Sequence, residues 1–415
     1  MNFLPLTRLD ALKAWSDFLP GIAQYAKQRN HVEPPHRNVS RLSAALRFRT
    51  LLEDEVLRDS LQQHPFQSVE KWVQEVCWRR YWKGWLERRP DVWDSWRRRM
   101  RELNETLPEA IRQRAQAVAA GESGVACMDA IVRELIATGY VHNHARMWWA
   151  SYWIHAERLP WELGADVFYR YLLDADAASN TLSWRWVAGL QTPGKTYLVR
   201  ASNIEKYAPD LLHRHPAGIE RIADGSVTPL VAAEFANTAR QALLEYPAVA
   251  PSSGRRVGIW LHMDDLVPEI GPLANLAPVS VAAFSQDHAN RHTLGLSERS
   301  LAAQEEALAD GLARAASHFS CPIELKNEVD PAACLTTWAL NHGLEEVVAF
   351  APTVGPVADL LPHVRQLLHS SGITLTLIRR ASDSHAFELA GSGFFPFWEK
   401  MSRHLRQQKN LFADL

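Results

Sequence analysis

The segment from Leu172 to Trp186 constrains the fold most, because it puts two acids, an amide and two indoles into a window of helical length. If the segment is helical, Asp176, Asn180 and Trp184 recur every four residues and share one face. At about 1.5 Å of rise per residue they span roughly 12 Å, the length of a planar three-ring ligand. A buried polar patch beside two packing tryptophans explains this window alone equally well.

Two other segments repeat this combination of polar and aromatic side chains on one helix face. The first face carries Asn143, Arg146 and Met147, and the second carries Glu75, Trp78 and Arg79. Polar groups on helices so rich in apolar residues are costly to bury unless they are paired. A shared polar ligand would satisfy all three faces together, so the sequence favours a ligand held between three helices.

At these residues the chain resembles the flavin-binding helical domain of the photolyase/cryptochrome family. Its motifs T-S-R-L-S, W-x-x-E-x-x-W-R-x-F/Y, V-D-A…H-N-x-x-R-M and D-G-D-x-A-x-N-x-x-x-W-x-W correspond here to residues 39–43, 72–81, 128–147 and 174–186. A chance match to one motif would be weak, whereas four in the family's order form a specific signal. The resemblance is much stronger over residues 20–207 than over residues 255–400.

The resemblance implies an FAD cofactor. The expected cofactor-binding residues are Tyr25, Ser40, Arg41, Leu42, Ser43, Arg79, Arg146, Asp174, Asp176 and Asn180. The segment from Ser40 to Ser43 would hold the diphosphate, with Val39 in place of the family's threonine. Without the resemblance, Ser40 would be an ordinary helix cap.

Four of these residues have particular roles in the resembled family. Asn180 would lie at the reactive flavin nitrogen, and Asp176 would hold the pyrimidine-like edge of the ring. Arg146 would pair with Asp174, because a buried ion is tolerated best with a partner. That arginine would also favour a reduced, anionic flavin.

The same resemblance implies blue-light-driven repair, in which photoexcited reduced flavin donates an electron to a pyrimidine dimer in DNA. The expected catalytic residues are Glu75, Trp78, Asn143, Met147 and Trp186. The two indoles would stack a flipped lesion, and Glu75 would donate to or polarise a lesion carbonyl. Asn143 and Met147 match the pattern for cyclobutane dimers, since family members that act on (6-4) lesions carry histidines there.

Some features weaken the case for DNA repair. His144 stands where the family often has an arginine that contacts DNA, and Leu182 would narrow the lesion cavity. The formal net charge is −2, so phosphate contacts would depend on a local patch such as Arg185, Lys195 and Arg200.

The alternative function is a cryptochrome-like blue-light photoreceptor that signals to a protein partner. It requires an electron relay, and Trp184 and Trp161 match the first two tryptophans of the family's relay. Trp93, Trp96 and Trp153 are the candidates for the third position. A flavin-binding protein without photochemistry is a third possibility.

From Arg255 onward, short apolar runs alternate with helical patterns. Strands are expected at 257–262, 279–284, 322–325, 346–350 and 373–378, with helices at 297–318, 331–343 and 356–371. This alternation predicts a parallel sheet with helices on both faces. The region is similar to the family's antenna domain, which precedes the flavin domain there, so we expect a circular permutation and a possible second chromophore of unknown identity.

The expected fold class is therefore α plus α/β. An N-terminal all-helical FAD-binding domain would precede a C-terminal, doubly wound, Rossmann-like sheet. The expected parts are residues 1–210, a connector at 211–254, the α/β domain at 255–400 and a tail at 401–415. Helices are expected at 3–29, 126–138, 141–157, 163–174 and 176–189, with breaks near Pro65, Pro90 and Pro108.

The four cysteines have neither metal nor redox spacing, which predicts a reduced, cytoplasmic protein without a metal. His142 is ambiguous, because a histidine in an apolar helix is usually a satisfied core residue. No apolar run is long enough to cross a bilayer, and we expect no membrane contact.

Overall fold

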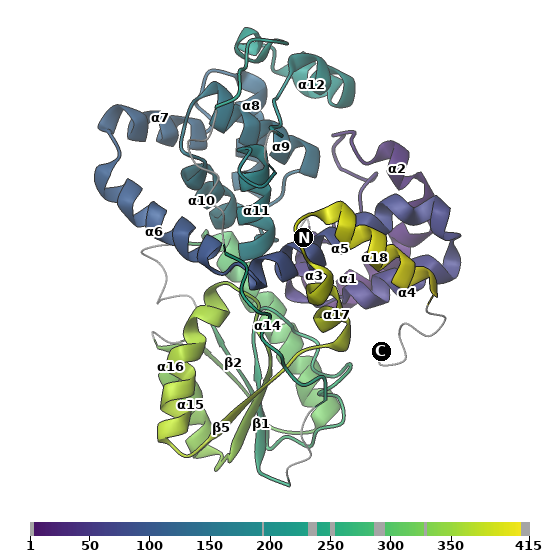
Figure 1. Ribbon diagram of the computed structural model, residues 1–415, viewed down its shortest axis with the longest axis vertical. Coiled ribbons are helices and arrows are strands. Elements are labelled where there is room, and N and C mark those ends of the chain that lie inside the picture. Colours follow the sequence, from purple (N-terminus) through teal and green to yellow (C-terminus); the bar gives the residue numbers. More distant parts are fainter. Residues whose placement is uncertain are drawn as a thin grey trace.

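The computed structural model describes residues 4–192, 195–230, 239–249, 254–285, 295–327 and 330–407. Its first half is a set of packed helices, and its second half begins with a parallel sheet below them in the view of Figure 1. The α plus α/β composition expected from the sequence is therefore present in the structure.

The helices of the first half are short to medium in length and are separated by tight turns. They are α1 (Arg8–Phe18), η1 (Leu19–Gln24), α2 (Tyr25–Gln28), α3 (Ser43–Phe48), α4 (Glu53–Gln63), α5 (Phe66–Glu87), α6 (Asp91–Thr106), α7 (Glu109–Ala119), α8 (Ala126–Thr138), α9 (Asn143–Ser151), the π-helical turn η2 (Tyr152–Ala156), α10 (Trp161–Tyr171), α11 (Ala177–Val187), α12 (Ala201–Tyr207), α13 (Pro209–Arg214) and η3 (Ile219–Ile222).

Proline sets several of these boundaries. Pro65, Pro90, Pro108 and Pro160 occupy the N-cap positions of α5, α6, α7 and α10. The proline ring has no N–H to donate and fixes φ, so it fits where a helix begins and not where one continues. The breaks expected near the first three prolines are confirmed.

The single helix expected over residues 3–29 is wrong over its described part. The chain forms α1, then the 3-10 turn η1, then the four residues of α2. Pro20 lies in the first turn of η1 and cannot donate the hydrogen bond that would extend α1. On α1, Leu9 is 77% exposed, whereas Trp15 is buried.

The helical half has a continuous apolar core that contains most of the tryptophans. Gly164 on α10 shows how closely the helices approach, because a Cβ at that position would meet the ring of Trp184 at 2.4 Å. The absent side chain therefore lets α10 and α11 pack with the indole between them.

Among the described residues of the second half, β1 (Val257–Leu261), β2 (Ser280–Ser285), β3 (Ile323–Asn327), β4 (Glu346–Phe350) and β5 (Thr374–Ile378) form one parallel sheet in the order β3-β2-β1-β4-β5. The covering helices are α14 (Glu298–Phe319), α15 (Pro331–Asn341) and α16 (Pro356–Ser370). The expected strands and helices of this half are confirmed to within a few residues. Short apolar runs identified the strands because both faces of the sheet are buried.

The two faces of the sheet are covered by different helices. One face, with Ile259, Val281 and Val348, packs on α14, and the other, with Trp260, Ala282 and Val347, packs on α15 and α16. Right-handed crossovers between parallel strands place helices in this way. The sheet is therefore doubly wound, as expected.

The closing helices α17 (Ala381–Leu389) and α18 (Phe394–Gln407) leave the sheet and pack against α5. Figure 1 shows them in yellow beside the N-terminal helices. Phe387, Phe397 and Trp398 belong to the core of the helical half. The domain boundaries stay a prediction, and residues 408–415 of the expected tail lie outside the described residues.

A search of the described helices for an apolar stretch of membrane-spanning length finds none.

Candidate functional site

A cavity of about 350 Å³ lies among α2, α3, α9 and the loop before α11. Its lining residues are Tyr25, Arg29, Asn30, Val39, Ser40, Arg41, Leu42, Ser43, Tyr140, Val141, His142, Asn143, His144, Arg146, Met147 and Asp174. Its volume falls within the usual range of small-molecule sites, about 300–1,000 Å³. Three of the four motifs singled out in the sequence thus meet at one cavity.

The segment that precedes α3 forms one wall of this cavity. Arg41 adopts a left-handed backbone conformation with φ of 55°, and the N–H of Leu42 donates to Ser40 Oγ over 3.3 Å. The N-cap residue of α3 is Leu42, so Ser40 closes a turn before the helix and does not cap it. This turn brings two hydroxyl side chains and a guanidinium to the cavity wall.

Arg146 and Asp174 form a two-bond ion pair at the cavity. Arg146 Nη1 donates to Asp174 Oδ1 over 3.1 Å, and Nη2 donates to Oδ2 over 2.9 Å. Arg146 Nε also donates to the carbonyl of Val141 over 2.8 Å. Burial disfavours the charged form of Asp174, but the Arg146 guanidinium, with Ser43 and Arg79, outweighs this effect and holds the pKa of that carboxyl below its usual value. The expected pairing is therefore present.

Asp176 and Asn180 lie outside the cavity lining. Asp176 is the N-cap of α11, where Oδ1 accepts from the N–H of Ser179 over 2.6 Å and Oδ2 accepts from Arg79. Asn180 Nδ2 donates to the carbonyl of Ala165 on α10 over 2.8 Å. The helix face predicted from Asp176, Asn180 and Trp184 is thus directed largely at α10, because α10 and α11 pack closely at Gly164.

Arg79 connects Asp176 to the cavity wall. Besides its ion pair with Asp176, its Nη2 donates to the carbonyl of Ser43 over 3.4 Å. The ten expected cofactor residues therefore fall into two groups. Seven line the cavity, and Arg79, Asp176 and Asn180 lie outside that lining.

The expected catalytic residues are also divided between two places. Asn143 and Met147 line the cavity from α9. Glu75 on α5 forms ion pairs with Arg29, which is itself at the cavity wall, and with Lys71 at 3.2 Å. Glu75 is therefore joined to the cavity wall through Arg29.

The two expected lesion-stacking indoles each have an aromatic neighbour. Trp78 lies face to face with Phe394 of α18, with ring centroids 3.6 Å apart and planes 7° apart. Trp186 is half-buried and stacks with Tyr197 at 5.9 Å. Neither indole is part of the cavity lining.

His142 is a cavity residue that the sequence left undecided. It is 1% exposed and its Nδ1 accepts from the N–H of His144 over 3.2 Å, which places the proton of a neutral imidazole on Nε2. Nε2 is buried without a hydrogen-bond partner among the described residues. Burial, together with neighbours led by His36, lowers the pKa of His142 to about 3. His142, a neutral imidazole with a buried and unsatisfied Nε2–H, therefore belongs to the residues that line the cavity.

Ring contacts among the tryptophans of the core form a series that includes Trp184. In the described ring pairs, Trp184 contacts Trp149 at 6.1 Å and Trp149 contacts Trp153 at 5.1 Å, whereas no such contact joins Trp184 to Trp161. Trp161 begins α10, one turn before Gly164. The sequence did not single out Trp149, because packing between helices, and not spacing along the chain, brings it to Trp184.

Two other expected relay residues form a separate pair. Trp93 and Trp96 of α6 lie 5.2 Å apart and both contact Tyr169.

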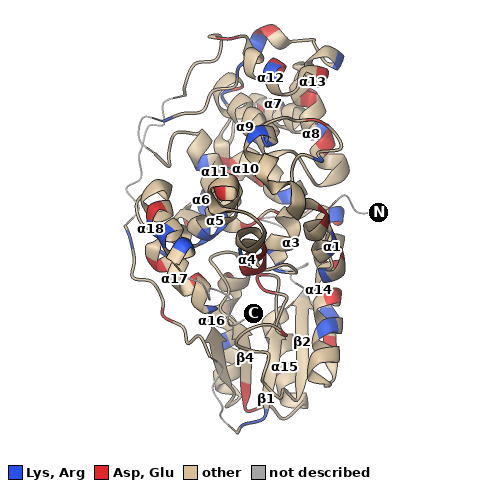
Figure 2. Ribbon diagram, turned by 90° about the vertical axis from the view of Figure 1, so that its right-hand side faces the viewer, with Lys and Arg blue, Asp and Glu red and all other residues tan. Residues whose placement is uncertain are grey.

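The proposed basic patch is only partly exposed. Lys195 and Arg200 are exposed, but Arg185 is 9% exposed and its burial lowers its pKa. Figure 2 shows Lys and Arg interspersed with Asp and Glu over the helices, in keeping with the small net charge. The inclusion of Arg185 in a surface patch is therefore wrong.

A family model described as the FAD binding domain of DNA photolyase matches residues 72–211. Similar curated proteins include the deoxyribodipyrimidine photo-lyases of Synechococcus sp. (28% identity over 233 residues, 50% of this chain and 46% of that protein) and Streptomyces griseus (30% over 185 residues, 41% and 39%). The photo-lyase of Thermus thermophilus is 34% identical over 137 residues, covering 32% of this chain and 31% of that protein. The chain thus spans less than half the length of these relatives.

Two solved structures show a partial likeness. A class III photolyase from Agrobacterium tumefaciens matches with a TM-score of 0.43 and 25% identity. The match covers 50% of this chain and 44% of the photolyase chain. A cryptochrome from Synechocystis matches with a TM-score of 0.41 and 20% identity. The match covers 57% of this chain and 53% of the cryptochrome chain.

Proposed function

We propose that the chain is a photolyase-like FAD protein that uses blue light to pass an electron from reduced flavin to a cyclobutane pyrimidine dimer in DNA. The matched FAD-binding model and the photo-lyase relatives support the photolyase/cryptochrome family. The observation that carries the proposal is the meeting of the Arg146–Asp174 pair with the Ser40–Ser43 segment at one cavity.

The residues at the cavity fit FAD chemically. Hydroxyls of Ser40 and Ser43 and the guanidiniums of Arg29 and Arg41 are suited to the oxygens of a diphosphate. His142 adds a buried N–H donor at Nε2 whose partner is absent from the described protein atoms. An unsatisfied buried donor costs about 1–3 kcal/mol, which a ligand acceptor would recover.

When bound, FAD supplies the light absorption and the transferred electron. The protein's part is to hold the flavin and to place the lesion next to it. Arg146 supplies fixed positive charge that favours a reduced, anionic flavin, and Asp174 holds this guanidinium in place through two hydrogen bonds. His142 remains neutral at physiological pH because of its lowered pKa, so it donates without adding charge.

The lesion would lie against α5 and α9. Asn143 and Met147 would contact it from α9, and Trp78 would stack it on the ring face that Phe394 leaves uncovered. The ion pair with Arg29, a residue of the cavity wall, would hold the Glu75 side chain in position. Trp186 would form the second aromatic wall.

A photoreceptor remains the second candidate, favoured by the buried contact series Trp184–Trp149–Trp153. Such a series suits photoreduction of an oxidised flavin, which repair by a reduced flavin does not itself require. A photoreceptor would be photoreduced by blue light yet leave dimers intact.

The decisive experiment illuminates the purified, reduced holoprotein with an oligonucleotide that contains one cyclobutane dimer. Repair restores the near-260 nm absorbance of thymine, and the dark sample is the control. Restoration supports repair. No restoration in this sample, together with blue-light photoreduction of a separate sample that holds oxidised flavin, supports the receptor.

We also infer that the domain order is circularly permuted relative to the resembled family. The order along the chain supports this, because the residues matched by the flavin-domain model precede the sheet. A rearranged chain with residues 255–407 placed before residues 4–254 should fold and bind FAD with unchanged affinity. A rearranged chain that folds without binding FAD would contradict the inference.

A further inference from the structure

The sheet has a crevice at the carboxyl ends of β1 and β4. These strands are neighbours, yet β1 leads to β2 on one side while the chain later returns to β4 on the other. In open parallel sheets this reversal of strand order is where ligands usually bind. If the sheet binds an antenna chromophore, as the sequence led us to expect, this crevice is the expected position.

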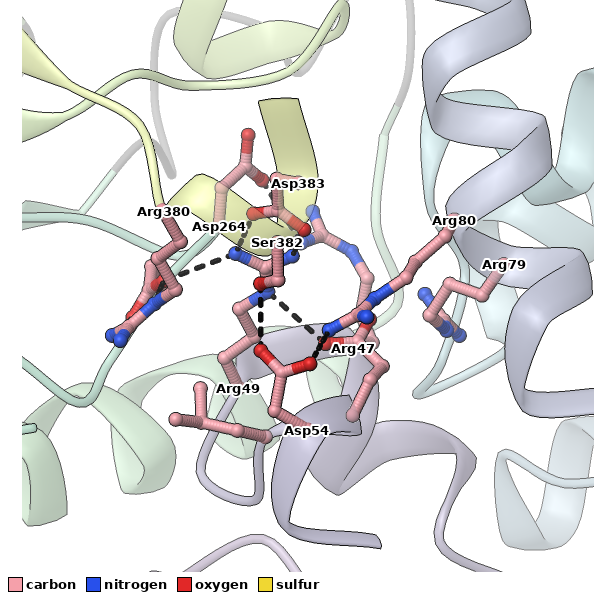
Figure 3. Close-up of polar contacts among 12 residues, drawn as sticks. Arg47, Arg49, Asp54, Arg79, Arg80, Asp264, Arg380, Ser382 and Asp383 are labelled. Carbon is pink, nitrogen blue, oxygen red and sulfur yellow. Dashed lines mark hydrogen bonds and ion pairs between the residues drawn. The ribbon is translucent and has the colours of Figure 1, made fainter. Parts of the chain in front are cut away.

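Arg49 of the helical half reaches the acids at this crevice, and Figure 3 shows it beside Asp383 and Arg380. The guanidinium of Arg49 donates to Asp383 over 2.6 and 2.7 Å and to Asp265 over 3.1 Å. Arg380, which follows β5, donates to Asp265 over 2.7 and 2.9 Å. The remaining space is about 10 Å³, close to the volume that holds one water. A second chromophore does not fit this crevice.

The neighbouring acid, Asp264, connects the sheet to the candidate flavin site. Its Oδ1 accepts from Arg47 Nη1 over 2.9 Å, and its Oδ2 accepts from the N–H of Thr353 over 3.0 Å. Arg47 Nη1 also donates to the carbonyl of Met263 over 3.2 Å, and its Nε donates to the carbonyl of Ala175 over 3.2 Å. Arg47 therefore bridges the end of β1 and the residue between Asp174 and Asp176.

The segment Asp174–Asp176, called the acid loop below, is the part of the candidate site that this bridge reaches. Asp174 holds Arg146 at the cavity, and Asp176 holds Arg79 and caps α11. Movement of the intervening carbonyl would therefore disturb two ion pairs. Because Arg47 and Asp264 are both buried, water cannot readily replace either partner.

Helix α5 is fixed to the same edge of the sheet. Glu87 Oε1 accepts from the N–H of Val354 over 2.6 Å, and Oε2 accepts from Arg379 Nη2 over 3.2 Å. Lys83 is 2% exposed and its charge, with that of Arg47, helps hold the pKa of Asp264 at about 2 against the effect of burial. The helix that carries Glu75, Trp78 and Arg79 is thus anchored to the sheet as well.

We propose that the carboxyl edge of the sheet acts as a buttress for the acid loop, with Asp264 and Arg47 as positioning residues for the flavin site. The cofactor half of this inference rests on the proposed function. Its structural half, that Asp264 restrains the acid loop through Arg47, can be tested without FAD.

The first test is amide hydrogen exchange of residues 172–180 in the full-length apoprotein. Asp264→Asn leaves the Arg47 charge unbalanced, and it should raise exchange of this segment about tenfold or more. The matched control is Arg97→Met, which removes an exposed ion pair between α6 and Asp359 of α16 at 2.7 Å. The control should exchange like the wild type. Wild-type exchange of residues 172–180 in folded Asp264→Asn would overturn the proposal.

A second variant covers the case in which Asp264→Asn does not fold. Arg47→Met combined with Asp264→Leu removes both buried charges at similar volume, a change that proteins tolerate better than the loss of one partner. This variant should fold and still exchange residues 172–180 about tenfold faster, because the Ala175 carbonyl loses its donor. Wild-type exchange here would also overturn the proposal.

FAD titration then tests the functional half. Both interface variants should raise the FAD dissociation constant about tenfold, while Arg97→Met should not change it. Unchanged affinity alongside faster exchange would overturn the role in cofactor binding. If the wild-type protein does not bind FAD, the proposed function is wrong. Amide hydrogen exchange of residues 172–180 would still decide whether the buttress exists.

Discussion

Phe394 and Trp78 lie in parallel contact, with ring centroids 3.6 Å apart and planes within 7° of each other. They are far apart in sequence, and the contact forms because α18, which follows the sheet along the chain, packs on α5. The closing helix therefore covers one face of the indole that is proposed to stack the lesion. Under the proposed function, the lesion would stack on the opposite face of this indole.

Substitution of Phe394 by Ala should both destabilise the fold and weaken lesion binding. The side chain is 5% exposed, and loss of a buried phenyl ring typically costs about 3–5 kcal/mol of unfolding free energy. Denaturant unfolding measures this cost, and titration with a dimer-containing oligonucleotide measures affinity. The control is Phe395→Ala, which removes a ring that is 71% exposed and should change neither. Equal behaviour of the two variants would refute the supporting role of Phe394.

Substitution of Asp174 by Asn should weaken FAD binding about tenfold or more, because it leaves the Arg146 guanidinium without its charged partner. Fluorescence titration of the apoprotein with FAD measures the change. Asp166→Asn serves as the control, since its pair with Arg170 at 3.1 Å lies on α10, outside the cavity lining. If both variants bind FAD like the wild type, the ion pair does not support the cofactor site.

His142 predicts a specific dependence of stability on pH. Its pKa is lowered to about 3 in the folded protein from an ordinary value of about 6.5, so between these values the unfolded chain binds the extra proton. The contribution of His142 to the free energy of unfolding is complete above about pH 6.5. It is lost as the pH falls toward 3, at up to about 1.4 kcal/mol per pH unit.

The apoprotein variant His142→Gln should therefore show a shallower loss of unfolding free energy between pH 6.5 and 4 than the wild type does. Urea unfolding at several pH values measures the slope. His363→Gln, at a half-exposed histidine, controls for loss of any histidine. Parallel slopes for the wild type and His142→Gln would contradict the lowered pKa.

The tryptophan contacts predict an order of effects on photoreduction. Trp184→Phe should abolish blue-light reduction of bound, oxidised flavin, and Trp149→Phe should slow it more than Trp161→Phe does, because the rings of Trp184 and Trp149 are in contact. Absorbance of the flavin under constant illumination gives the rates. A larger effect of Trp161→Phe than of Trp149→Phe would contradict this order and support the relay expected from the sequence, Trp184 and Trp161.

Much of the secondary structure was predictable because its causes are local. Prolines at helix starts and short apolar runs in a sheet buried on both faces leave direct marks on the sequence. The pairing of Arg146 with Asp174 was also predicted, from the resemblance. The return of α18 to α5 was not, because its cause is a packing match between segments at opposite ends of the chain.

The directions of several site residues were harder to predict for a related reason. Helical spacing places Asp176, Asn180 and Trp184 on one face, but it does not tell which neighbour that face meets. Here the neighbour is largely α10, since Gly164 allows close approach. Likewise, nothing in the spacing of Arg47 reveals its bond to Asp264, which arises only when the sheet docks on the helices.

The most direct test of the account is repair of a single cyclobutane dimer by the reduced holoprotein under blue light. The account predicts that thymine absorbance returns in the light and not in the dark, and that Trp78→Ala reduces the rate at saturating flavin. Full occupancy by reduced FAD with no recovery of absorbance in the illuminated wild-type sample would contradict it.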